Sequence, residues 1–168
     1  MNAMSISWEF IADCLRSELS DYGGLLHLFE SQQRALFGRD PDTVLRLANE
    51  IEQHAFAVAT SRLERERAVE AFAVENGRPS NSSLRAMLPL VDADARPLLE
   101  ALINEVNLLI HRVRKTSRHN HLLLSRAVEV HQETLRQLRP NAFTKTYSPA
   151  GRVSIATAQP AVALRAAG

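Results

Sequence analysis

Several residue types that define other protein classes are scarce in this sequence. It has one cysteine among 168 residues, and aromatic residues make up only 5% of it. The lone Cys14 excludes a disulfide within the chain and fits a reducing compartment. So few aromatic residues disfavour a β-sandwich core, whereas a hydrophobic content of 45% favours packed helices. The formal net charge of +1 gives no overall field that would attract nucleic acid.

Long apolar runs are lacking as well. No stretch of about eighteen apolar residues occurs, so we expect no insertion into a membrane. No basic segment followed by a short apolar stretch is visible near the first residue, so we expect no secretory signal. Together with the single cysteine, these features predict a cytoplasmic location for a protein whose length suits one domain.

The strongest pattern that is present is a helical periodicity from Asp94 to Leu138. This stretch contains no glycine, and its one proline, Pro97, fits within the first turn of a helix. Residues three or four apart form a mostly apolar seam, which is typical of one long helix packed along its length. The seam consists of Leu99, Ile103, Val106, Ile110, Val113, Ser117, Asn120, Leu124, Ala127, His131, Leu135 and Leu138.

Two further long helices are expected before this one, from about Ser5 to Phe37 and from Pro41 to about Glu75. Between them, Gly38 suits the C′ position, Asp40 the N-cap and Pro41 the first helical position. The seam of the first helix is Ile11, Leu15, Glu18, Tyr22, Leu25, Phe29, Gln32 and Leu36, and it keeps phase across Gly23 and Gly24. The seam of the second helix is Val44, Ala48, Ile51, Ala55, Val58, Arg62, Arg65, Val69 and Phe72.

Turn-forming residues separate the second long helix from the last. The second helix is broken at residues 76–82, Asn-Gly-Arg-Pro-Ser-Asn-Ser. Ser82 can cap a short helix that Pro89 ends, and the last helix should begin near Asp94. Because short connections make long helices antiparallel neighbours, we predict an all-α fold. It is an antiparallel bundle or coiled coil of three long helices plus a short connecting helix, forming a helical-bundle domain over residues 1–139.

Residues 140–168 differ in composition from the rest of the chain. They contain no acidic residue and are rich in Ala, Ser, Thr and Val, with helix breakers at Pro149, Gly151 and Pro160. Such a segment should be a flexible, mostly disordered tail. Apolar residues recur along it nonetheless, which favours ordering on a partner. They are Phe143, Tyr147, Val153, Ile155, Val162 and Leu164.

Catalytic and metal-binding patterns are weak. The di-iron helical bundles need Glu-x-x-His motifs, and this sequence has none. No Gly-rich phosphate loop or Cys-x-x-Cys occurs, and no histidine lies within a helical turn of Cys14. We therefore predict a protein that is not an enzyme and needs no cofactor. A histidine phosphotransfer module stays open, since one exposed histidine such as His111 or His121 would suffice.

The run from Arg112 to His119 is the one basic patch that invites nucleic acid. Its charges wrap around the predicted helix, and no aromatic residue lies among them. If the chain folds back, Glu50 and Glu52 of the second helix fall roughly opposite Arg118. We therefore interpret this run as a solvated, salt-bridged face and expect no nucleic-acid partner.

The chain resembles the FlgN family of flagellar type III export chaperones. Three long helices with a break at residues 38–41 follow the family's order. Residues 120–129 read Asn-His-Leu-Leu-Leu-Ser-Arg-Ala-Val-Glu. They are similar to the family's pattern of an Asn, then two Leu, then a small residue and an acidic residue. Residues 146–152, Thr-Tyr-Ser-Pro-Ala-Gly-Arg, resemble the Tyr-x-x-x-Gly-x element that follows it in the family.

This resemblance implies a function and a place for it in the chain. FlgN-like chaperones bind the hook–filament junction proteins FlgK and FlgL, prevent their premature assembly and deliver them to the flagellar type III export apparatus. The export gate is therefore a further candidate partner. The C-terminal part of the family binds substrate, which corresponds here to about residues 120–155. The candidate partner-binding residues are Asn120, Leu122, Leu123, Val128, Leu135, Leu138, Phe143, Tyr147, Gly151, Arg152 and Ile155.

Alternatives remain at the level of residues and of the whole chain. Asn120 fits either a binding role or a polar seam position that sets helix register, and Tyr147 fits either binding or docking on the bundle. A non-enzymatic, oligomeric coiled-coil scaffold also fits the helical pattern. The sequence leaves open the oligomeric state and which hook-associated protein is bound.

Overall fold

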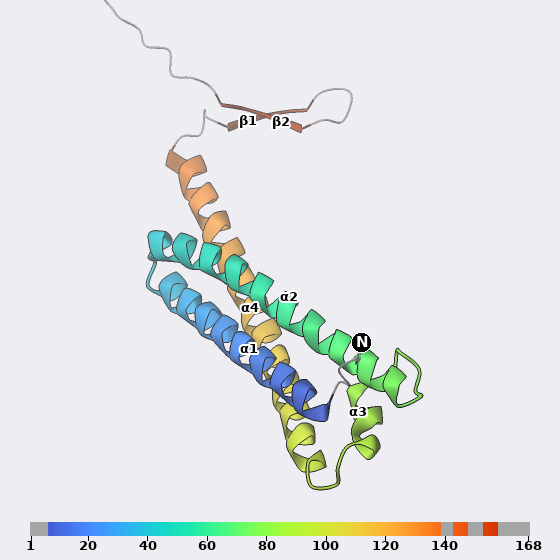
Figure 1. The fold of residues 1–168 in the computed structure, drawn as a ribbon. Helices are drawn as coiled ribbons and strands as arrows, with labels where there is room; N and C mark the ends of the chain where they lie inside the picture. The colour runs from blue at the N-terminus through green and yellow to red at the C-terminus, as the bar shows by residue number, and fades with distance from the viewer. Residues whose placement is uncertain (1–6, 139–142, 148–152, 158–168) are drawn as a thin grey trace, which may run out of the picture. The chain divides into compact units, whose positions relative to one another are not determined.

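The computed structural model describes residues 7–138, 143–147 and 153–157. The helices are α1 (Trp8–Phe37), α2 (Pro41–Glu75), α3 (Leu84–Met87), the 3-10 helix η1 (Leu88–Leu90) and α4 (Arg96–Leu138) (Figure 1). Two strands follow, β1 (Phe143–Tyr147) and β2 (Val153–Thr157). The predicted all-α fold with three long helices and a short connecting helix is confirmed. The chain divides into two compact units, Met1–Leu122 and Leu123–Gly168.

The turn between α1 and α2 follows from its sequence, with one difference from the prediction. Asp40 caps α2, since its Oδ1 accepts a hydrogen bond of 3.1 Å from the Thr43 amide. That bond holds the pKa of the Asp40 carboxyl below its usual value. Gly38 ends α1 in the right-handed conformation, whereas the left-handed residue is Arg39, with a φ of 54°. The left-handed position therefore lies one residue later than the predicted one.

The connection between α2 and α4 also differs slightly from the prediction. Ser83, rather than Ser82, caps α3 by accepting a hydrogen bond from the Ala86 amide. Pro89 lies in the first turn of η1 instead of ending a helix there. The Arg96 side chain at the start of α4 donates to the Val91 and Pro89 carbonyls, at 3.0 and 2.9 Å. These contacts fold the connection against the first turn of α4.

The core of the first unit lies between α1, α2 and α4, and the seams of α1 and α4 form much of it. Every predicted seam position of α1 is buried or half-buried. The seam of α4 is buried or half-buried from Leu99 through Leu124, and each seam position from Ala127 onward is exposed. None of the helices in residues 7–138 combines the length and apolar character that crossing a membrane requires.

The seam of α2 was predicted only in part. Val44, Val58, Val69 and Phe72 are buried as expected. Ala48, Ala55 and Arg62 are exposed, however, and Leu47, Ser61 and Ala68 are buried in addition. Compared with the predicted seam, the buried face of α2 is rotated toward Leu47 and Ser61. The polar contacts between α2 and α1 determine this choice of face.

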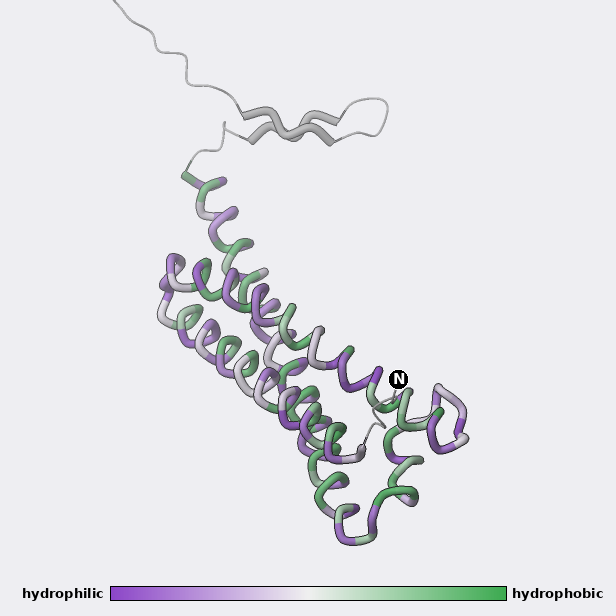
Figure 2. The backbone as a smooth tube through the Cα atoms, in the orientation of Figure 1, coloured by the Kyte–Doolittle hydropathy of each residue, from purple (hydrophilic) through white to green (hydrophobic). Residues whose placement is uncertain are grey.

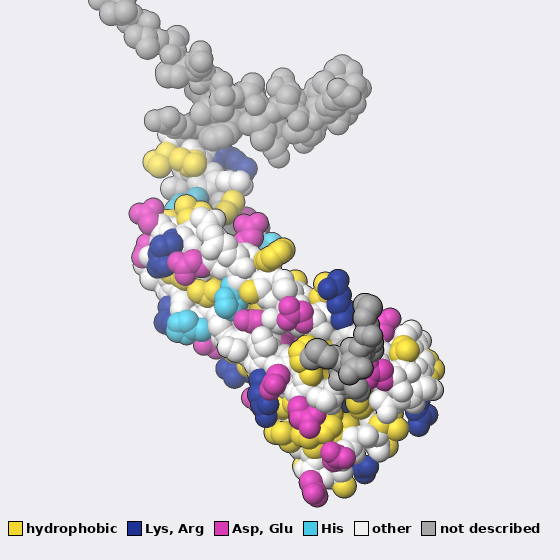
Figure 3. All heavy atoms as spheres, in the orientation of Figure 1, with side chains coloured by type: hydrophobic (Ala, Val, Ile, Leu, Met, Phe, Trp, Pro, Cys, Tyr) yellow, Lys and Arg dark blue, Asp and Glu magenta, His cyan; other side chains and the backbone are white. Residues whose placement is uncertain are grey.

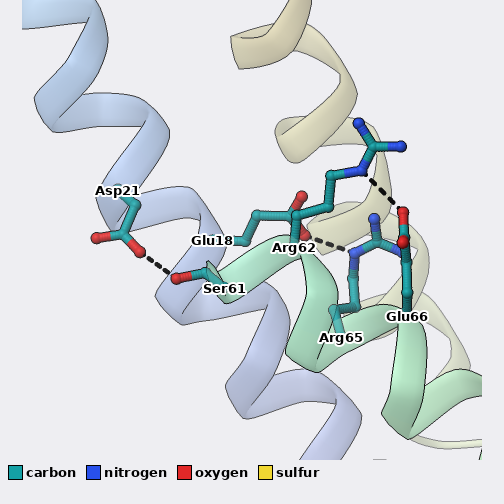
Figure 4. Close-up of polar contacts among 6 residues, drawn as sticks. All are labelled: Glu18, Asp21, Ser61, Arg62, Arg65 and Glu66. Carbon is teal, nitrogen blue, oxygen red and sulfur yellow. Dashed lines mark hydrogen bonds and ion pairs between the residues drawn. The ribbon is translucent and has the colours of Figure 1, made fainter. Parts of the chain in front are cut away.

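Figure 4 shows the polar contacts that join α1 and α2. Arg65 Nε donates to Glu18 Oε2 at 2.5 Å, and Glu18 is fully buried. Ser61 Oγ donates to a carboxylate oxygen of Asp21 one turn further along α1. Because a buried carboxylate is costly without a partner, this ion pair fixes the register of α2 on α1.

Gly24 allows α2 to approach α1 closely. A Cβ atom at residue 24 would lie 2.6 Å from Nε2 of His54, so the His54 ring would have to shift to make room for a side chain there. The same His54 nitrogen lies 2.8 Å from the Asp21 carbonyl oxygen. α1 nonetheless runs as one helix through Gly23 and Gly24, as the seam predicted. The absence of a side chain at Gly24 thus leaves room for the His54 ring to pack against α1.

Candidate protein-binding site

The last turns of α4 expose an apolar face. Every residue from Arg126 through Leu138 is exposed, although the helix continues without interruption to Leu138. Val128, Leu135 and Leu138 have exposed fractions of 51%, 49% and 73%. Their spacings of seven and three residues place them on one side of the helix. We call these three residues the α4 stripe.

Polar residues occupy most of the other sides of the same segment, with Val130 as an exposed apolar residue among them. Glu133 pairs with Arg136 at 3.1 Å and accepts a further hydrogen bond from Gln137. Figure 2 shows hydrophobic and hydrophilic residues alternating along this part of α4. The segment is thus an amphipathic helix whose apolar side is exposed, which is the arrangement of a helix that lies in the groove of another protein.

Asn120 is buried rather than exposed. It is 1% exposed, and its Nδ2 donates to the Phe29 carbonyl oxygen at 2.7 Å and to Gln32 Oε1 at 3.1 Å. Within the described residues its Oδ1 has no hydrogen-bond partner. Both contacts reach α1, so the position fits the interpretation as a polar seam residue that sets register.

Leu122 and Leu123 differ in exposure. Leu122 is 63% exposed, whereas Leu123 is only half-buried. At 100° per residue, neither lies on the side of α4 that carries Val128 and Leu135. Of the predicted residues on α4, the structure therefore brings together Val128, Leu135 and Leu138, and it leaves Asn120, Leu122 and Leu123 apart from them.

The two strands pair as an antiparallel hairpin, which the sequence analysis did not predict. Their register joins Phe143 with Thr157, Lys145 with Ile155 and Tyr147 with Val153. Because residues alternate between the two faces of a strand, these six residues belong to one face. The predicted binding residues Phe143, Tyr147 and Ile155 therefore share that face.

Val153 belongs to the same face, although it was not among the predicted binding residues. The sequence signal for it was the alternation of apolar and small polar residues in Val-Ser-Ile-Ala-Thr, which is typical of a strand. The predicted residues Gly151 and Arg152 lie outside the described residues.

The basic run on α4 packs against α1 rather than α2. Arg112 pairs with Glu30 of α1 at 3.5 Å, and His119 Nδ1 lies 2.8 Å from Gln33 Nε2. The expectation of a salt-bridged face thus holds for Arg112, whose partner lies on α1. Glu50, which was expected opposite Arg118, instead pairs with Arg46 one turn away on α2, at 2.5 Å.

The candidate reactive groups of the described residues are one cysteine and several histidines. Cys14 is buried, and desolvation together with the nearby Glu64 carboxylate raises the pKa of its thiol, which suppresses the reactive thiolate. Among residues 7–138 and the two strands, no three His, Cys, Asp or Glu residues are grouped so as to hold a metal ion. His111 and His121 are both exposed.

Comparison with known proteins gives one match. The family described as FlgN protein matches residues 4–155. Neither the curated proteins nor the solved structures include a significant match to the chain. The matched range includes all of α1 to α4, the α4 stripe and most of the hairpin.

Proposed function

The chain belongs to the FlgN family of flagellar export chaperones, and we propose that it binds hook-associated proteins of the FlgK and FlgL type before their export. The α4 stripe and the Tyr147 face of the hairpin would form its client-binding elements. It would act in the cytoplasm, without catalysis, and hand its client to the export apparatus.

The observation that carries this proposal is the exposure of the α4 stripe. Leu138 is 73% exposed at the end of a helix that has a mostly apolar seam. Burying a Leu-sized side chain contributes about 1.5–3 kcal/mol of free energy. Burial of the three exposed stripe residues against a client would therefore contribute substantially to the free energy of binding. A client helix laid along the stripe would bury them.

The mode of binding would be reversible masking. By the family resemblance, the clients expose amphipathic helical ends that assemble with one another in the filament. A chaperone helix that occupies the apolar side of such an end prevents that assembly and keeps the client soluble. Release stays feasible because the contact is one helix face rather than an enclosed core.

Two identical substitutions on opposite sides of α4 test the proposal. Val128 lies on the stripe, whereas Val130 is 64% exposed on another side of the same helix. We expect Val128→Asp to weaken FlgK or FlgL binding about tenfold or more, roughly 1.4 kcal/mol, because it places a carboxylate in an apolar contact. Val130→Asp is the control and should leave affinity unchanged.

Isothermal titration with purified FlgK and FlgL would measure both variants. Circular dichroism would verify that each keeps the helical content of the unmodified chain. Equal affinities for the two variants would contradict a role for the stripe. Failure of the unmodified chain to bind either client would instead favour the coiled-coil scaffold interpretation.

A further inference from the structure

The side of α2 that faces away from α1 carries large apolar residues. Leu45, Phe56 and Leu63 are 66%, 77% and 46% exposed, and Val74 is 58% exposed. At 100° per residue, these four lie within about 20° of one line along the helix. The buried residues Val58 and Phe72 lie on the opposite side, so the packing of the first unit does not explain this line of apolar residues.

Exposure on this scale indicates a contact surface. Phe56 has the highest exposed fraction among the large hydrophobic residues of the described part of the chain. Single exposed apolar residues are common on protein surfaces, but a row of them along one helix face marks an interaction site. Figure 3 shows hydrophobic side chains among acidic and basic ones on the side of the molecule that it displays.

The spacing of these four residues is symmetric. The intervals are eleven residues from Leu45 to Phe56, seven from Phe56 to Leu63 and eleven from Leu63 to Val74. Two copies of α2 aligned antiparallel about the point between Ala59 and Thr60 would therefore match apolar residues with apolar residues. Phe56 would lie level with Leu63 of the second copy, and Leu45 level with Val74.

The polar residues beside the apolar line follow the same symmetry. In that alignment Glu52 lies level with Arg67 of the second copy, and Asn49 lies level with Glu70. Both members of the first pair are exposed, and neither forms an ion pair within the described residues. Because one twofold axis matches apolar and charged residues together, the surface is complementary to itself.

We propose that this α2 face binds a second copy of the chain as an antiparallel, twofold-symmetric helix pair. The α2 face comprises Leu45, Asn49, Glu52, Phe56, Leu63, Arg67, Glu70 and Val74. In such an interface the same patch serves both protomers, so each contact occurs twice. The face is about 43 Å long, enough for a helix pair packed over eight turns. The inference concerns the first unit and does not depend on the proposed function.

Charge reversal tests the register of the pair. Glu52→Arg places an arginine level with Arg67 of the other copy at two symmetric positions in the interface, and Arg67→Glu places two carboxylates level with each other at the same positions. Each single variant should weaken the dimer about tenfold or more, and the double variant Glu52→Arg/Arg67→Glu should restore it. Analytical ultracentrifugation of the full chain measures all four proteins, with Glu105→Arg on α4 as a control that leaves dimerisation unchanged.

A cysteine near the twofold axis gives an independent readout. In the proposed pair, residue 59 lies beside residue 59 of the second copy, within the range that a disulfide spans. Ala59→Cys should therefore form a covalent dimer on mild oxidation, whereas Ser17→Cys on the exposed side of α1 should not.

A monomeric full chain would overturn the inference. So would a dimer that neither charge reversal weakens, since its interface would then lie elsewhere, and so would a double variant that stays as weak as the single ones. Restoration by the double variant, together with cross-linking through residue 59, would establish both the surface and its partner.

Discussion

Asn120 and Gln32 meet in the interface between α4 and α1, with Nδ2 of Asn120 3.1 Å from Oε1 of Gln32. Both are seam positions that sequence periodicity placed in line with apolar residues. Both are buried, at 1% and 5% exposure. A buried polar pair between two long apolar seams fixes which turns of the helices lie side by side, because any other register leaves the amides without partners.

Asn120→Ala should therefore destabilise the first unit. It removes the donor to the Phe29 carbonyl and to Gln32 Oε1, leaving a buried amide oxygen without its partner. We expect a loss of about 1–3 kcal/mol in the free energy of unfolding, measured by urea denaturation. An unchanged stability combined with weaker client binding would favour the binding role for Asn120 instead.

The Glu18–Arg65 pair should show an asymmetric response to substitution. Arg65→Met leaves the fully buried Glu18 carboxylate without its cation and should cost about 3–5 kcal/mol of folding free energy. The double variant Glu18→Leu/Arg65→Met should recover most of this loss, because two apolar side chains can pack where the ion pair was. Thermal unfolding of the three proteins gives the comparison, and a double variant less stable than Arg65→Met would contradict it.

Alkaline pH should destabilise the first unit. Burial is the main cause that raises the pKa of Cys14 above 9.0 and of Tyr22 above 10.0, and the nearby carboxylates Glu64 and Glu18 add to it. For both groups the folded state holds the proton more tightly than the unfolded state. Stability is therefore full below these usual pKa values and is lost as pH rises above them and through the raised pKa values of the folded state.

Urea unfolding as a function of pH measures this effect. The double variant Cys14→Ala/Tyr22→Phe has neither ionisable group, so its stability should fall less as pH rises from neutral to values above the usual tyrosine pKa of 10.0. Identical pH profiles for the variant and the unmodified chain would show that other groups dominate the alkaline loss.

Sequence periodicity predicted α1 and α4 well because their apolar residues lie on one face. α2 was harder, since Val44 and Val58 on one side compete with Leu45 and Phe56 on the other. The choice between these faces depends on pairs such as Glu18–Arg65, which are distant in sequence. A single sequence does not reveal such pairs, so the seam was placed partly on exposed alanines.

The site was predictable to a smaller extent than the fold. Leu135 and Leu138 of the α4 stripe continued a strong seam, and Val128 was named through the family resemblance, but only the structure shows that Val128 and Leu138 are exposed. The hairpin was missed because its strands are short and lie between Pro, Gly and Ala residues, a composition that is typical of disorder. Its register now relates Tyr147 to Val153 and Ile155, which sequence spacing alone could not do.

The most direct measurement is the capture of FlgK and FlgL by the full chain and by a 1–139 truncation, expressed in the same cells. The truncation keeps α1 to α4 and removes both strands, so its helical content should be retained. We predict that the full chain captures a hook-associated protein and that the truncation binds it about tenfold more weakly. Equal capture by the two forms would contradict a client-binding role for residues 140–168, and no capture by either form would contradict the proposal that this chain binds hook-associated proteins.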